Sequence, residues 1–165
     1  MERLWAPWRM EYIDKVNEPK ECIFCVDNPS EEEMFERLIL VVEDLYVIIM
    51  NKFPYNTGHL LIAPRRHVGD FLDLTEEEGK ALFEGTRKSI EVLKKVMKPH
   101  GFNVGLNLGK VAGAGIVDHL HVHVVPRWNG DTNFMPVVGE TKVMPQLLKE
   151  LYPRLKEAFD KLRGK

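Results

Sequence analysis

Apolar residues recur along this chain with two periods, and each period predicts one kind of secondary structure. Short β-rich or alternating runs predict strands over residues 38–42, 45–50, 59–63, 102–108 and 116–125. Recurrence every three or four residues predicts a long central helix, from a capping box at Thr75 to Pro99, and a C-terminal helix over 143–163. The two helical stripes are Leu82, Thr86, Ile90, Leu93 and Met97, and Leu148, Leu151, Leu155, Phe159 and Leu162.

The order of these elements indicates the fold class. Short strands joined by hairpin-like connections around one long helix are typical of an α+β fold with a mainly antiparallel sheet. No repeat or linker interrupts the 165 residues, so we expect one domain over 1–165, with an extended aromatic arm at 1–20. Pro153 predicts a kink or a break in the C-terminal helix. The arm and the stripe of that helix are the chain's own candidates for contacts with a partner subunit.

The last predicted strand carries a row of three alternating histidines. His119, His121 and His123 should point to one face of the strand, because side chains alternate between faces. The apolar residues between them should point to the other face and enter the core. Pro126 is expected to end the strand, because it removes a donor from the ladder.

Composition and charge exclude several classes of partner. The formal net charge of −2 provides no basic field for nucleic acid, and no apolar run is long enough for a membrane span. The N-terminus lacks the apolar core of a signal peptide, so we expect a cytoplasmic protein. The two cysteines form the motif Cys22-x-x-Cys25, which in a reducing compartment favours a metal or redox role over a disulfide.

The histidine row suits two kinds of chemistry, and its spacing does not decide between them. A neutral imidazole is a good nucleophile near pH 7 and can form a phosphoramidate by attacking phosphorus. Alternatively, His-x-His on a strand is a common way to hold zinc. The glycine-rich loop over 109–115 favours phosphate, because its backbone N–H groups can approach phosphate oxygens closely.

Two segments resemble the histidine-triad (HIT) nucleotide hydrolases and transferases. The run 119–127, with its three alternating histidines and Pro126-Arg127, is similar to the motif of that family. The run 51–67 is similar to the segment that contacts ribose and phosphates, and the resemblance covers roughly residues 22–137. The segments 4–9 and 127–137 look like the bacterial branch that includes diadenosine tetraphosphate phosphorylases.

The resemblance implies a role for each matching residue. His121 would be the nucleophile that carries the nucleotidyl group, with His119 holding its ring from one side. Asn51 would bind ribose. Trp128 would either close over the phosphate or base end of the site or only pack at its rim. The residues implied to contact nucleotide or phosphate are Asn51, His59, Asn107, Gly113, Gly115, His119, His123 and Trp128. Many members have Gly-Gln-Ser or a similar run before the motif, which provides a side-chain donor to the leaving group. This chain has Gly113-Ala114-Gly115-Ile116 there, so backbone N–H groups or Lys110 would donate instead.

The resemblance also implies a structural zinc site. Relatives with this Cys-x-x-Cys hold zinc with two histidines, which here would be His67 and His119 beside Cys22 and Cys25. Any magnesium would arrive with the substrate, because the chain has no clear carboxylate cluster for it.

The function expected from residues and resemblance together is cleavage of a dinucleoside polyphosphate, such as diadenosine tetraphosphate, through a nucleotidyl-His121 intermediate. Water or phosphate would be the acceptor. The alternatives are an adenosine phosphoramidate hydrolase, a nucleotide-binding or metal-binding module without turnover, and a Cys-x-x-Cys redox protein. The family resemblance implies a homodimer or a higher homo-oligomer.

Overall fold

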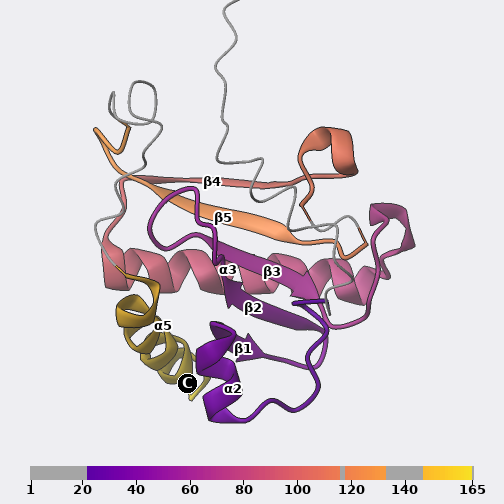
Figure 1. Ribbon diagram of the computed structural model, residues 1–165, viewed down its shortest axis with the longest axis horizontal. Helices are drawn as coiled ribbons and strands as arrows, with labels where there is room; N and C mark the ends of the chain where they lie inside the picture. The colour runs from indigo at the N-terminus through magenta and orange to yellow at the C-terminus, as the bar shows by residue number, and fades with distance from the viewer. Residues whose placement is uncertain (1–21, 116–117, 133–146, 165) are drawn as a thin grey trace, which may run out of the picture.

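A computed structural model describes residues 22–115, 118–132 and 147–164 of the chain (Figure 1). It contains a five-stranded antiparallel sheet in the order β1-β2-β3-β5-β4. This confirms the predicted α+β fold. The strands are β1 (Ile39–Val42), β2 (Tyr46–Met50), β3 (Leu60–Pro64), β4 (Gly101–Leu106) and β5 (Val122–Arg127). The helices are α2 (Glu31–Glu36), α3 (Glu76–Met97) and α5 (Leu148–Arg163), with 3-10 turns η1 (Phe71–Asp73) and η2 (Lys110–Ala112).

The histidine strand β5 is inserted between β3 and β4. It pairs with β3 only from Val122 to Val124, but with β4 from Val122 to Arg127. The prediction that Pro126 ends the strand is wrong. The carbonyl of Pro126 accepts from Asn56 on the side of β3, beyond the last β3 pair. Its missing N–H therefore lies where the ladder with β3 has already ended, and no ladder hydrogen bond is lost.

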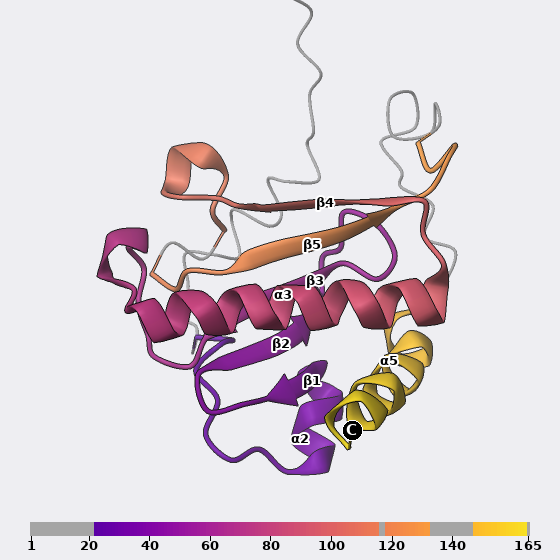
Figure 2. The same cartoon turned by 180° about the vertical axis from the view of Figure 1, so that it is seen from behind.

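One face of the sheet is covered by α3, which runs along β2, β3 and β5 (Figure 2). The helix begins at the predicted capping box, in which Thr75 and Glu78 bond to each other's backbone N–H groups. Its buried stripe differs in part from the prediction, since it includes Gly85 and Ser89. A Cβ at Gly85 would lie 2.9 Å from Ile62, so the glycine allows the helix to approach the sheet closely.

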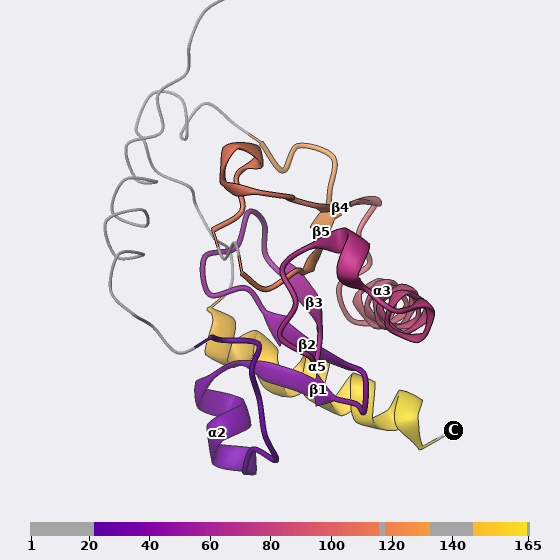
Figure 3. The same cartoon turned by 90° about the vertical axis from the view of Figure 1, so that its right-hand side faces the viewer.

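The C-terminal helix α5 packs against α3 and β1 on the same face of the sheet (Figure 3). It is continuous from Leu148 to Arg163, so Pro153 does not break it. Residues 143–146 of the predicted helix lie outside the described residues. The stripe through Leu151, Leu155 and Phe159 is buried in this chain's own core. It is therefore not available to a partner subunit, contrary to the prediction.

The other face of the sheet carries a smaller apolar cluster and the histidine row. The cluster joins Phe24 and Val26 of the N-terminal segment to Ile39, Ile49 and neighbouring strand residues. Side chains alternate along the row as predicted, since the apolar residues between the histidines belong to the core under α3. His119 and His121, however, precede the first ladder pair of β5, so the strand starts later than predicted. In the part of the chain that the structure describes, no helix has the length and apolar character to cross a membrane.

Candidate functional site

His119 is fully buried, and both of its ring nitrogens are engaged. Its Nε2 lies 2.8 Å from the carbonyl oxygen of Pro64. A carbonyl only accepts, so Nε2 carries the proton and Nδ1 keeps a lone pair. That lone pair faces the Sγ atoms of Cys22 and Cys25, at 3.1 and 3.7 Å. The structure therefore directs His119 toward the cysteines and not toward a substrate, so its predicted contact with nucleotide or phosphate is not supported.

The four predicted metal-binding residues come together around that lone pair. The Nδ1 atom of His67 lies 3.2 Å from the Sγ of Cys25, and all four ligand atoms lie within 4.8 Å of one another. A tetrahedral zinc ion separates its nitrogen and sulfur ligands by about 3.3–3.8 Å. The cluster has the donor types that zinc prefers, and small movements of the side chains would bring all four atoms to these separations. Desolvation, and then the neighbouring Cys22 sulfur, raise the pKa of Cys25 to about 11. A bound cation would reverse this by stabilising the thiolates.

His121 is oriented by the residue two positions before it. Its Nδ1 lies 2.9 Å from the carbonyl oxygen of His119, so Nδ1 donates and Nε2 is left with a lone pair. The ring packs against Phe24, with centroids 4.9 Å apart, and burial lowers the pKa of His121. The imidazole is therefore neutral near pH 7, with Nε2 as its nucleophilic atom.

A hydrogen-bond chain fixes the proton of His123. The backbone N–H of Tyr55 donates to Nδ1 of His59 at 3.1 Å, so the proton of His59 must lie on Nε2. That Nε2 lies 3.0 Å from Nδ1 of His123, which therefore accepts. Burial, and then the neighbouring His121, lower the pKa of His123 to about 4. The neutral ring carries its proton on Nε2, an atom without a hydrogen-bond partner among the described residues, and offers that N–H to a ligand.

The remaining predicted binding residues lie in loops next to the ends of the strands. Asn51 lies beside the pair, with its Nδ2 3.2 Å from Nδ1 of His59. Asn107 donates to the carbonyl of Gly113 at 3.4 Å, so it holds the glycine-rich loop. Gly113 has a φ of 92°, which favours glycine, and Gly115 is half-buried at the end of the described loop.

Trp128 lies at the opposite end of β5 from the glycine-rich loop (Figure 1). It is half-exposed, and its backbone N–H donates to Asp131. The same Asp131 forms a two-pronged ion pair with Arg127 and accepts from Asn56 at 2.7 Å. The structure thus separates Trp128 from the loop, while a polar network ties the β2–β3 loop to the end of β5.

Sequence reasoning missed three contributors to the site. Phe24 supports the rings of His119 and His121, the carbonyl of Pro64 fixes the tautomer of His119, and Tyr55 stacks on His123 at 5.7 Å. Phe24 and Tyr55 are each close to a predicted ligand in sequence, and that proximity is the signal that could have found them. The Pro64 carbonyl leaves no sequence signal, because every residue has one.

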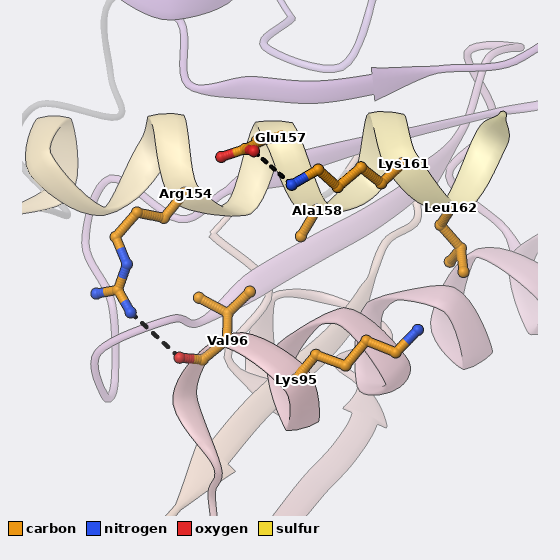
Figure 4. A pocket seen from close by; sticks show the side chains of 7 residues that line it. All are labelled: Lys95, Val96, Arg154, Glu157, Ala158, Lys161 and Leu162. Atoms are coloured by element: carbon orange, nitrogen blue, oxygen red, sulfur yellow. Dashed lines mark hydrogen bonds and ion pairs between the residues drawn. The ribbon is translucent and has the colours of Figure 1, made fainter.

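Two hollows lie on opposite faces of the sheet. One of about 720 Å³ lies between α3 and α5, where Arg154 donates to the carbonyl of Val96 (Figure 4). The other, of about 260 Å³, lies on the histidine face beside Tyr55, Val125 and Arg127. None of the predicted site residues lines either hollow, but Tyr55 of the smaller one stacks on His123. The smaller hollow is therefore the one that adjoins the histidine row.

Comparison with known proteins agrees with this geometry. Residues 32–130 match the HIT domain family. The chain is 43% identical over 159 residues to an AP-4-A phosphorylase of Mycobacterium tuberculosis, covering 91% of this chain and 80% of that protein.

Two solved structures share the fold. A hypothetical histidine triad nucleotide-binding protein from Sulfolobus tokodaii has a TM-score of 0.65 at 25% identity, over 86% of this chain and 94% of the other. A Zn-bound histidine triad family protein from Mycobacterium smegmatis has a TM-score of 0.63 at 24% identity, over 77% and 86%. With the family match and the histidine row in agreement, this chain belongs to the HIT domain family.

Proposed function

We propose that this chain cleaves dinucleoside polyphosphates, such as diadenosine tetraphosphate, through a nucleotidyl group carried on His121. The observation that carries the proposal is the pair of opposite proton positions in the row. His121 presents an unprotonated Nε2, and His123 presents a protonated one, with ring centroids 4.8 Å apart. A nucleophile beside a hydrogen-bond donor is an arrangement that suits attack on the phosphorus of a phosphoanhydride.

The first step forms a phosphorus–nitrogen bond and breaks a phosphorus–oxygen bond. The lone pair on Nε2 of His121 attacks the α-phosphorus, and the departing nucleotide takes the bridging oxygen with its electron pair. The Nε2–H of His123 donates to a phosphate oxygen and stabilises the charge that develops there. Proton transfer from Nδ1 of His121 is not needed, because the carbonyl of His119 stabilises the positive imidazole ring that forms.

The second step reverses these bond changes with a different acceptor. An oxygen of inorganic phosphate attacks the phosphorus, and the bond to Nε2 breaks, so a nucleoside diphosphate is released and His121 is neutral again. Water in place of phosphate would release a nucleoside monophosphate. We favour phosphate, because the relative with 43% identity is a phosphorylase acting on this class of substrate.

The phosphate-binding groups are supplied by elements on both sides of His121. We assign phosphate contacts to His123 and the loop held by Asn107, which includes Gly113 and Gly115. The predicted phosphate contact of His59 is not supported, because His59 is buried and both its ring nitrogens are engaged, so we assign it the orientation of His123. We assign the ribose to Asn51, which lies beside His59. Trp128, at the far end of β5, is assigned to the rim of the site.

A zinc ion held by Cys22, Cys25, His67 and His119 would tie the N-terminal segment to the histidine row. Zinc is a structural cross-link in such a four-ligand site and takes no part in the reaction. The donor set and its size support this assignment, as does the Zn-bound structure with the same fold. Both cysteines are free thiols, which fits a reducing compartment such as the cytoplasm.

We further propose a homodimer that uses the exposed edge of the sheet. The edge strand β4 exposes apolar side chains, including Val104 at 48% and Leu106 at 36%. An exposed apolar edge strand favours pairing with a second copy. Light scattering should give twice the chain mass, and Val104→Lys should shift the protein toward the monomer. A wild-type monomer at micromolar concentration would contradict this proposal.

The proposed reaction is tested by turnover of diadenosine tetraphosphate with and without inorganic phosphate, with the products separated by chromatography. ADP and ATP that appear only with phosphate would support phosphorolysis. AMP and ATP formed without phosphate would show hydrolysis in place of phosphorolysis. Rapid quenching with labelled substrate should trap acid-labile label on the protein. Absence of both label and turnover would overturn the proposal and favour a binding module.

A further inference from the structure

The hollow of about 260 Å³ on the histidine face lies directly beyond His123 along β5. Val125, two residues after His123 on the same face, contributes to its lining. Tyr55 joins the two sites, because its ring lines the hollow and stacks on His123 with an angle of 11° between the planes. Asn51, to which we assign the first ribose, does not line it. The lining residues are Tyr55, Asn56, Asn103, Val125, Arg127, Asp131 and Thr132.

The charges around the hollow are already paired, which argues against a phosphate as its occupant. Arg127 donates to both carboxylate oxygens of Asp131, at 2.6 and 2.9 Å, and its remaining nitrogen donates to Asn103 at 2.7 Å. Asn56 adds a further donor to Asp131. The Arg127 side chain and the Asp131 carboxylate therefore neutralise each other, and the hollow presents no net positive charge to an anion.

The shape and the polar groups of the hollow suit a flat, uncharged ring system. Tyr55 is 45% exposed and provides an aromatic wall, and the buried side chain of Val125 provides an apolar surface. Asn103 uses its Oδ1 on Arg127, which leaves its amide N–H₂ as the donor for a ligand. The volume is below the roughly 300–1,000 Å³ of pockets that enclose a whole drug-sized ligand, so it suits one part of a larger molecule.

The hollow and the proposed reacting atoms lie along one face of β5. His121, His123 and Val125 succeed one another on one face, so the row spans about 13 Å from His121 to Val125. Across the ladder from His123 lies Gly105 of β4, and a Cβ placed there would have no atom within 4 Å. The space beside His123 on the side of β4 is thus free of a side chain at Gly105, and we assign the chain of phosphates to it.

We infer that this hollow binds the nucleobase of the departing half of a dinucleoside polyphosphate, stacked on Tyr55 and hydrogen-bonded to Asn103. The inference rests on the proposed function and extends it. The departing phosphates pass His123, and the second base is held beyond it. The hollow therefore distinguishes substrates with a second nucleoside from substrates that end in a phosphate.

The test compares two ligands that share the reacting end, diadenosine tetraphosphate and adenosine 5′-tetraphosphate. Their affinities are measured by titration calorimetry in the His121→Ala protein, so that no turnover is needed. Asn103→Phe and Thr132→Phe fill the hollow from two different exposed side chains, and Asn103→Ala removes the amide without filling it. Thermal unfolding of each variant verifies that it folds.

We expect the second nucleoside to tighten binding about tenfold in the unfilled protein, within the range of one base stacked on an aromatic ring. Each Phe variant should remove that gain and leave the affinity for adenosine 5′-tetraphosphate within about twofold. Asn103→Ala should remove part of it. Equal losses for both ligands, or no loss for either, would overturn the inference. Because binding is measured without chemistry, a failure of the proposed reaction would be seen separately, as absent turnover in the wild-type protein.

Discussion

His119 and His121 are two residues apart on one face of the molecule, yet they present opposite ring nitrogens. His119 donates from Nε2 to the carbonyl of Pro64 and turns its Nδ1 toward Cys22. His121 donates from Nδ1 to the carbonyl of His119 and keeps Nε2 for the substrate. In each ring a backbone carbonyl fixes the proton, and the nitrogen left over decides which chemistry the residue can perform.

The ring orientations bear on a choice that residue spacing leaves open. A row of three histidines could hold a metal or attack phosphorus, and the orientations support our proposal that different members of the row take the two roles. We call the part around His119 the metal end and the part around His121 and His123 the phosphate end. The two ends are linked by the backbone of His119, which provides a ring to one and a carbonyl to the other.

The largest expected effect is at the phosphate end. His121→Ala removes the nucleophile, and we expect turnover of diadenosine tetraphosphate to fall by at least about 10⁴-fold. The cysteines and both metal-binding histidines are unchanged, so zinc content should remain one per chain. Steady-state rates and metal analysis of the same preparation measure both. A variant that keeps more than a hundredth of the rate would contradict the assignment of His121.

A smaller effect is expected from a substitution at the metal end. It should reduce zinc affinity strongly and turnover only in part. Cys22→Ser removes a thiolate ligand, so zinc affinity should fall by more than about 100-fold in a competition with a chelating dye. Turnover should persist at a reduced rate, because the carbonyl of His119 remains beside Nδ1 of His121. The matched control is Ser30→Ala, which changes a hydroxyl in the same segment outside the cluster. Unchanged zinc affinity in Cys22→Ser would contradict the proposal that Cys22 binds zinc beside His119.

Acidification should destabilise the phosphate end of the histidine row. The pKa of His123 is lowered to about 4, whereas an unfolded histidine titrates near about 6.5. Between these values the unfolded chain binds more protons, so the free energy of unfolding should decrease as pH falls from about 6.5 toward 4. We expect His123 to account for about 2 kcal/mol of the loss between pH 7 and pH 4.5.

Urea unfolding of the wild type and of His123→Gln at the two pH values isolates this contribution. The glutamine keeps a polar side chain but does not titrate, so the variant should lose less stability on acidification. Parallel losses in the two proteins would show that His123 is not protonated with the shift described.

Much of the fold follows from local patterns in the sequence. The period of the central helix and its capping box locate α3 to within a residue, because a helix depends on neighbours three and four positions away. The close approach of Gly85 to Ile62 has no such signal, because it depends on a strand that is distant in sequence. The same applies to Pro126, whose place inside β5 depends on where the pairing with β3 ends.

The sequence predicted which residues form the site better than it predicted their hydrogen bonds and tautomers. The alternation of His119, His121 and His123 and the motif of Cys22 and Cys25 are visible in sequence, and the structure brings the four metal-binding residues together. The tautomers are not visible, because they depend on backbone atoms that every residue carries. The network of Asn56, Arg127 and Asp131 joins two loops about 70 positions apart, and no local pattern predicts it.

The smallest expected effect is at Glu78, which supports the metal end from a distance. Its carboxylate accepts from Arg66, the neighbour of His67, at 2.7 and 2.8 Å and from the backbone N–H of Thr75 at 2.9 Å. These bonds, chiefly the one from Arg66, lower the pKa of Glu78 to about 2. The stability they provide is therefore complete above about pH 4.5 and is lost as pH falls toward 2.

Glu78→Gln keeps an acceptor for Thr75 but removes the charge that faces Arg66. We expect a loss of about 1 kcal/mol at pH 7, measured by urea unfolding, and a smaller loss at pH 3. Glu77→Gln, an exposed residue of the same helical turn, should change stability by less than about 0.5 kcal/mol. Because Arg66 holds the segment that carries His67, zinc affinity should also fall a few-fold in Glu78→Gln while the rate per folded enzyme stays unchanged. A fall in the rate with zinc affinity unchanged would mean that the two ends of the histidine row are coupled through α3 and not through the backbone of His119.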